Sequence, residues 1–366
     1  MHQHRFLRTF KAVCLLTLIA FGCEPPQRET DVLNTSLEAE TAGGKFPYKK
    51  LSTYNFFKDK LNRLEPNPEI IPYQPASSLF TDYALKSRFI YFPDGEKAQL
   101  IANQFTFPIG TILIKNFYFP KDFRNTEGER KIIETRLLIN GEKGWEAYPY
   151  IWNEDQTDAV LKVVGGEIEV AFVDQSGKEQ IINYIIPNKN QCKTCHNKSE
   201  VLAPIGIEVQ HLNNQYQFAD TLSNQLALWQ KLGKLDGFQG ADAHPAMINY
   251  EDKNLPLDQR AMAYLDINCA HCHSPEGPAS TSGLFLTYDQ TDPMKLGIFK
   301  TPVAAGNGAG TFKFDIYPGK ADQSILTHRM NSTEVGVAMP ELGRTTIHQE
   351  GVELIREWIN SMESNK

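Results

Sequence analysis

The sequence predicts a chain of two parts: an antiparallel β-sandwich-like domain at residues 46–190, followed by an all-α region. Before residue 190, short segments alternate between apolar and polar residues, with turn signals such as Asp94-Gly95 between them. After residue 190, apolar residues recur at helical spacing instead. The hydrophobic fraction of 41% and the charged fraction of 22% suit a chain with well-filled cores.

The β-rich domain is expected to begin with a short helical stretch near residues 53–64. Polar-aromatic clusters at Glu134-Thr135-Arg136 and at residues 148–155 could line a ligand groove, although ordinary cross-strand pairing is the favoured explanation. Alternation predicts seven strands, at residues 88–92, 104–107, 111–119, 131–139, 145–150, 167–173 and 180–186.

The N-terminus has the pattern of an export signal. Three basic residues precede an apolar run that is too short to span a bilayer. The run ends in Ala20-Phe21-Gly22 before Cys23, which resembles the site where bacterial lipoproteins are cleaved and lipidated. We expect a lipoprotein signal peptide at residues 1–22, a lipidated Cys23 and a flexible tether over residues 23–45. The alternative is an ordinary signal peptide, with Cys23 incidental.

The remaining cysteines carry the strongest functional signal. Of six cysteines, Cys14 lies in the signal and Cys23 at its end, so four remain. They form two C-x-x-C-H motifs, in which the thiols attach a haem and the following histidine binds its iron. We therefore expect two covalently bound haem c groups. The attachment residues are Cys192, Cys195, Cys269 and Cys272, and the iron ligands are His196 and His273.

Other uses of C-x-x-C fit less well. A zinc site would place the second pair about 15–20 residues after the first, whereas these motifs begin 77 residues apart. Thioredoxin-like chemistry would need a βαβ setting, which neither motif has. An export signal agrees with haem attachment, which takes place outside the bacterial cytoplasm.

The second motif lies in the segment 245–366, where a helix is expected to run from Asn254, as N-cap, into the motif. The chain closes with another helix, for which Thr346 and Gln349 have capping-box spacing. Met339 lies in the loop before that helix, 66 residues after His273, and is the expected sixth iron ligand. Met330 is the nearest rival for that position. His271, inside the motif, is expected to face outward.

The first motif lies in the segment 191–244, with no helix expected before it and one helix expected near residues 222–235. This segment is too short for an independent domain, so the first haem is expected between the β-rich domain and the C-terminal segment. Its distal ligand stays open. His211, His244 and Met247 are candidates, and an open distal position is the other possibility.

These motifs, in this order, resemble an uncharacterised family of exported dihaem c-type cytochromes, many of them lipoproteins, with a C-terminal class I cytochrome c-like domain. The resemblance implies the two haem attachments and Met339 as a ligand. It also implies a neighbouring parallel β-helix protein as one candidate partner, and it supplies no substrate. The residues that carry it are Asn190–His196, Pro204-Ile205-Gly206, Tyr264–His273, Met339–Arg344, Glu134–Leu138 and Tyr150–Asp155.

The expected function is periplasmic electron transfer between a partner redox protein or dehydrogenase and the respiratory chain. The alternatives are a dihaem peroxidase with an open first haem and a carbohydrate-binding module coupled to redox chemistry. The net charge of −7 becomes −10 without residues 1–22, and no basic stripe is present, which argues against nucleic acid as a partner. The residue after Cys23 is Glu24, and not the aspartate that is associated with retention of lipoproteins in the inner membrane. We therefore expect the protein at the periplasmic face of the outer membrane in preference to the inner membrane.

Overall fold

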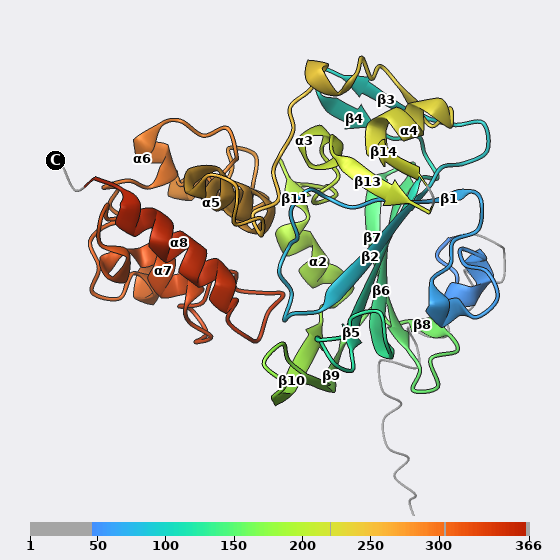
Figure 1. Ribbon diagram of the computed structural model, residues 1–366, viewed down its shortest axis with the longest axis horizontal. Helices are drawn as coiled ribbons and strands as arrows, with labels where there is room; N and C mark the ends of the chain where they lie inside the picture. Colours follow the sequence, from blue (N-terminus) through green and yellow to red (C-terminus); the bar gives the residue numbers. More distant parts are fainter. Residues whose placement is uncertain (1–45, 220, 304, 364–366) are drawn as a thin grey trace, which may run out of the picture. The chain divides into compact units, whose positions relative to one another are not determined.

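A six-stranded antiparallel sheet is the largest element of the computed structural model, which describes residues 46–363 except residues 220 and 304 (Figure 1). Both faces of its central strands are covered: of the nine residues in β5, all but Lys115 and Tyr118 are buried. In sheet order, the strands are β1 (Ile70–Pro72), β2 (Leu85–Tyr91), β5 (Ile112–Pro120), β6 (Arg130–Gly141), β7 (Gly144–Trp152) and β8 (Ala159–Leu161).

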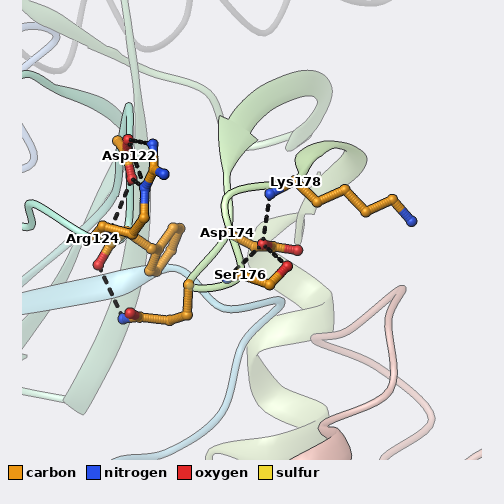
Figure 2. Close-up of polar contacts among 7 residues, drawn as sticks. Asp122, Arg124, Asp174, Ser176 and Lys178 are labelled. Atoms are coloured by element: carbon orange, nitrogen blue, oxygen red, sulfur yellow. Dashed lines mark hydrogen bonds and ion pairs between the residues drawn. The ribbon is translucent and has the colours of Figure 1, made fainter.

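A separate hairpin pairs β9 (Gly166–Val173) with β10 (Glu179–Ile186). Its turn is organised by Asp174, which accepts hydrogen bonds from the backbone N–H and hydroxyl of Ser176 at 2.9 and 2.6 Å and from the backbone N–H of Lys178 at 3.0 Å (Figure 2). These donors hold the pKa of the Asp174 carboxyl well below its usual range. Gly177 supplies the positive φ of 84° that the turn needs. Beside the turn, Arg124 pairs with Asp122 at 2.6 Å (Figure 2).

Residues 191–244 pair and pack with the β-rich part. Its last strand, β15 (Leu235–Asp236), pairs in parallel with β3 (Ala98–Ile101), which also pairs with β4 (Gln104–Thr106). Trp229 is fully buried against Phe92 and neighbouring aromatic rings. The other elements of this segment are α2 (Lys189–Cys195), β11 (Asn197–Lys198), β12 (Val201–Leu202), α3 (Val209–Leu212), β13 (Gln215–Phe218), β14 (Thr221–Asn224) and α4 (Gln225–Lys231).

The C-terminal segment consists of short helices joined by long loops. Ile355 of α8, Tyr264 of α5 and Leu326 of α7 belong to one buried cluster. The helices are α5 (Leu257–Leu265), which continues as a π-helical turn η4 (Asp266–Ala270), α6 (Pro293–Leu296), α7 (Ile325–Met330) and α8 (Gln349–Ser361). Short 3-10 turns are η1 (Leu51–Tyr54), η2 (Leu61–Arg63), η3 (Ala241–Ala243), η5 (Ser280–Ser282), η6 (Gly306–Ala309) and η7 (Ala321–Gln323). No helix among the described residues combines the length and apolar character that crossing a bilayer requires.

Loops of the C-terminal segment are bound to the β-rich part by partly buried polar contacts. Asp82 accepts hydrogen bonds from the backbone N–H groups of Thr345 and Thr346, at 2.7 and 2.8 Å, and from both hydroxyls. The ring of Phe80 stacks on His348 with centroids 4.2 Å apart. The predicted capping box at the last helix is therefore wrong, because the Thr346 side chain binds Asp82 and α8 has no side-chain cap.

The predicted fold class needs correction. All seven predicted strands coincide with observed strands, but they form one large sheet with smaller sheets beside it, not a two-sheet sandwich. The all-α cytochrome c-like region is wrong: residues 191–244 contain five short strands, and loops dominate the segment that follows. The cause is that apolar residues three or four apart also occur in loops that pack on a core, so the spacing alone does not establish a helix.

Candidate functional site

The first C-x-x-C-H motif is carried by helix α2. The side chain of Asn188 accepts a hydrogen bond from the N–H of Gln191 at 2.8 Å, and the Gln191 side chain accepts one from the N–H of Asn188 at 2.9 Å. This reciprocal cap starts the helix just before the motif, so Cys192 and Cys195 lie on one helical turn. No helix was predicted here, although Asn-x-x-Gln was a readable signal.

The second motif begins where α5 gives way to the π-helical turn η4. Leu265 is the last residue of α5, and Cys269 lies within the wider turn that follows. His273 closes the motif, with its N–H bound to the carbonyl of Cys269 at 2.9 Å. The helix begins after Pro256 and not at the predicted cap Asn254, whose side chain instead binds Asp252.

The two motifs meet in space. The ligand atoms of Cys195, Cys272 and His271 all lie within 4.8 Å of one another. The prediction that His271 faces outward is therefore wrong, since its ring is directed to both motifs and its Nδ1 is buried without a hydrogen-bond partner in the described chain. Residues that are 76 and 77 positions apart thus form one cluster.

The thiols of this cluster are electrostatically unequal. The neighbouring Cys272 thiol lowers the pKa of Cys195 to about 5, and His271 adds to the effect. The same contact raises the pKa of Cys272. Burial raises the pKa of Cys192, and it raises the pKa of Cys269 to about 12. All four cysteines are free thiols, so each is available for covalent attachment.

Both predicted proximal histidines are half-buried and held neutral. The Nδ1 of His196 donates a hydrogen bond to the carbonyl of Ala203 at 2.9 Å, so its Nε2 carries the lone pair. Burial lowers the pKa of His196 to about 3 and that of His273 to about 4. The buried Nδ1 of His273 has no hydrogen-bond partner among the described residues. A neutral imidazole suits an iron ligand, so both residues fit a haem, and in His196 the tautomer is also fixed.

A cavity of about 480 Å³ opens beside the cluster, in the range of small-ligand sites. Its lining includes Cys195 and His271 from the two motifs, and also His211, Asp266 and Ile267. Polar and apolar groups therefore share the space next to the first motif.

The three candidates for the distal ligand of the first haem differ in their surroundings. His211 lines the cavity, and its buried Nδ1 has no hydrogen-bond partner among the described residues. His244 uses both ring nitrogens: Nδ1 is 2.7 Å from Asn103, and Nε2 accepts from the Gln239 N–H at 3.2 Å. Met247 is 4% exposed and packs in the C-terminal hydrophobic cluster. His211 therefore has the most suitable geometry of the three.

Met339 lies in the loop between α7 and α8, where its backbone is held at both ends. Its N–H donates to the carbonyl of Arg329 at 3.0 Å, and its carbonyl accepts from Arg344 at 2.8 Å. The rival Met330 is buried in the C-terminal cluster. Coordination of iron by Met339 stays a prediction.

No family model, curated protein or solved structure matches this chain. The resemblance to a family of dihaem c-type cytochromes is corrected accordingly: no family model supports it, and the described chain after residue 190 is not the all-α haem-binding region that it implied. The predicted signal peptide (1–22), the lipidated Cys23 and the tether (23–45) lie outside the described residues.

Proposed function

We propose that the protein binds two haem c groups and carries electrons between a redox partner, such as a dehydrogenase, and the respiratory chain. The observation that carries this proposal is the meeting of two C-x-x-C-H motifs, with Cys195, His271 and Cys272 within 4.8 Å. Two adjacent attachment points suit a chain that relays electrons, because transfer between bound groups requires them to be close.

The chain's own residues would divide the tasks. Cys192 and Cys195 would anchor one haem, and Cys269 and Cys272 the other. When bound, each haem supplies an iron that gains and loses one electron. The Ala203 carbonyl orients His196 by accepting from Nδ1, and this leaves Nε2 to bind metal.

Haem content tests the proposal directly. The full chain would be produced with a haem c maturation system and measured by the pyridine-haemochrome assay after denaturation, which leaves only covalently attached haem. We expect two haems per chain, one in the Cys192→Ala/Cys195→Ala variant and one in Cys269→Ala/Cys272→Ala. A Ser176→Ala variant, at a distant turn, should keep both. A chain without covalent haem contradicts the proposal.

The partner and the location are also proposals. We propose a periplasmic redox partner, with a parallel β-helix protein as one candidate, and a lipid anchor at Cys23 in the outer membrane. The net charge of −7 favours a partner with a basic surface. Membrane fractionation of the wild type and of Cys23→Ala tests the anchor: the variant should move to the soluble periplasmic fraction.

A mononuclear metal site is the second candidate, and the same cluster favours it. Two thiols and an imidazole are the ligands that Zn²⁺ selects, and those of Cys195, Cys272 and His271 are adjacent. His271 separates the two candidates because it is neither an attachment residue nor the histidine that follows C-x-x-C. His271→Ala should remove bound zinc if this candidate is right, and should leave the haem count at two if the first is right.

A further inference from the structure

A row of cations crosses one face of the six-stranded sheet. Antiparallel pairing places Arg88 of β2 directly opposite Lys115 of β5, and Lys115 directly opposite Arg136 of β6. Lys86 lies two residues before Arg88, and alternate residues of a strand share a face, so it extends the row. We call Lys86, Arg88, Lys115 and Arg136 the cationic row.

The row carries more positive charge than its surroundings neutralise. Glu134 is the buried acid beside it, and it binds Arg136 at 2.5 and 2.8 Å and Tyr184 at 2.7 Å. Within the described chain, neither Arg88 nor Lys115 forms an ion pair, and Arg88 is only 8% exposed. Like charges directly opposite one another on a sheet are destabilising, and burial increases that cost.

Other contacts compensate for this cost only in part. The ring of Phe117 has Lys115 Nζ at 5.0 Å and Arg136 at 4.3 Å from its centroid, and such contacts contribute about 0.5–2 kcal/mol each. Burial, followed by the neighbouring cations Arg88, Lys86 and Arg136, lowers the pKa of Lys115 well below its usual range. A bound anion would remove this imbalance.

The row faces the first motif. It lies between two hydrophobic clusters on the sheet, one containing Ile90 and Leu113 and the other Phe117. Helix α2, which carries Cys192 and Cys195, contacts β7, and β7 pairs with β6, the strand of Arg136. Burial lowers the pKa of His196, and the charges of Lys115 and Arg136 add to that effect. A ligand held at Cys192 and Cys195 would therefore have these cations beside it.

We infer that Arg88, Lys115 and Arg136 bind the carboxylates of an anionic ligand, and that this ligand is the pair of propionates of the haem attached at Cys192 and Cys195. The second half of the inference rests on the proposed function. Arginine suits this task because its planar guanidinium binds a carboxylate with two parallel hydrogen bonds. A free dicarboxylate or inorganic phosphate has the same chemistry and is the other source.

The sign of a stability change tests the inference. With carboxylates bound, Lys115→Met removes an attraction and should lower the melting temperature by at least about 2 °C. The Cys192→Ala/Cys195→Ala chain cannot attach the first haem. In that chain, Lys115→Met removes only the repulsion between Lys115 and its neighbouring cations, so it should raise the melting temperature. Lys131→Met, at an exposed position of β6, is the matched control and should leave the melting temperature of both chains unchanged.

In the haem-loaded protein, Lys115→Met should also lower the reduced-to-oxidised ratio of the first haem at a fixed potential at least threefold, because a nearby cation favours the added electron.

Added succinate and inorganic phosphate identify the source of the anion. Both should raise the melting temperature of the Cys192→Ala/Cys195→Ala chain and leave the haem-loaded wild type unchanged, because propionates already fill the row. Equal stabilisation of both proteins would show that the cationic row binds anions but that haem propionates do not occupy it. If Lys115→Met raises stability in both backgrounds and neither anion stabilises the chain, the inference is overturned.

Two controls keep these outcomes distinct. The haem count is measured first. Absence of haem would contradict the proposed function, but succinate and phosphate would still test whether the cationic row binds anions. If Lys115→Met does not fold, Arg88→Lys keeps the charge but loses the two-pronged geometry, and it should weaken succinate binding at least threefold. Unchanged succinate binding in Arg88→Lys would exclude Arg88 from the site.

Discussion

His211 donates a hydrogen bond from Nε2 to the Oδ1 of Asp266 at 3.0 Å, and both side chains are buried. His211 belongs to α3, in the segment of the first motif, whereas Asp266 opens the π-helical turn that carries Cys269. The other carboxylate oxygen of Asp266 accepts from the Tyr288 N–H at 2.8 Å. This contact links the two motif segments and engages Nε2 of His211, so Nδ1 is the ring nitrogen that Asp266 does not bind.

Among the described residues, Nδ1 of His211 has no hydrogen-bond partner, and this leads to the first prediction. If it is the distal ligand of the first haem, His211→Ala should convert that haem from six-coordinate, low-spin to five-coordinate, high-spin iron. Visible and electron paramagnetic resonance spectra of the oxidised protein measure this change. His244→Ala is the control and should leave the spectra unchanged. A high-spin first haem already in the wild type, with peroxide turnover, would favour the peroxidase alternative.

Met339 should set the potential of the second haem. A thioether ligand raises the reduction potential of haem iron, so Met339→Ala should lower the midpoint of one haem and leave the other unchanged. A redox titration followed by visible spectroscopy measures both midpoints. Met294→Ala is the matched control because Met294 is 56% exposed on α6. Unchanged midpoints in Met339→Ala would mean that another residue binds the iron.

Asp82 should be important for stability because it is 2% exposed and accepts from Thr345 and Thr346. Asp82→Ala leaves those partly buried donors without an acceptor, at a cost of about 2–4 kcal/mol in the free energy of unfolding. Urea denaturation measures the loss, and exposed Asp155→Ala should stay within about 0.5 kcal/mol of the wild type. A small effect at Asp82 would show that water replaces the carboxylate at no cost.

His348 should make stability depend on pH. Burial between aromatic rings lowers its pKa from 6.5 to about 4. Below pH 6.5 the unfolded chain therefore binds a proton that the folded chain excludes, so stability is lost as the pH falls from 6.5 towards 4. The contribution of His348 is about 1–3 kcal/mol over that window. His348→Gln should lose less stability than the wild type between pH 7 and pH 4.5 in urea denaturation, and equal losses would contradict the prediction.

Local structure was largely predictable from the sequence. Alternation along β6 and β7 reflects the two-residue period of a strand, which depends only on neighbouring residues. The missed helix α2 is also local, since Asn188 and Gln191 cap it from within four residues. The all-α prediction failed because Leu286 and Leu296, outside the long helices, pack on the same core as Tyr264 and Ile355.

The sequence by itself determined the chemistry of the two motifs: which thiols come in pairs and which histidine follows each pair. Only the tertiary structure decided that Cys195 meets Cys272 and His271, and that Arg88, Lys115 and Arg136 form a row. The physical reason is register. A shift of one residue in a strand pair would move Lys115 to the other face of the sheet, and local periodicity carries no information about which residue it opposes.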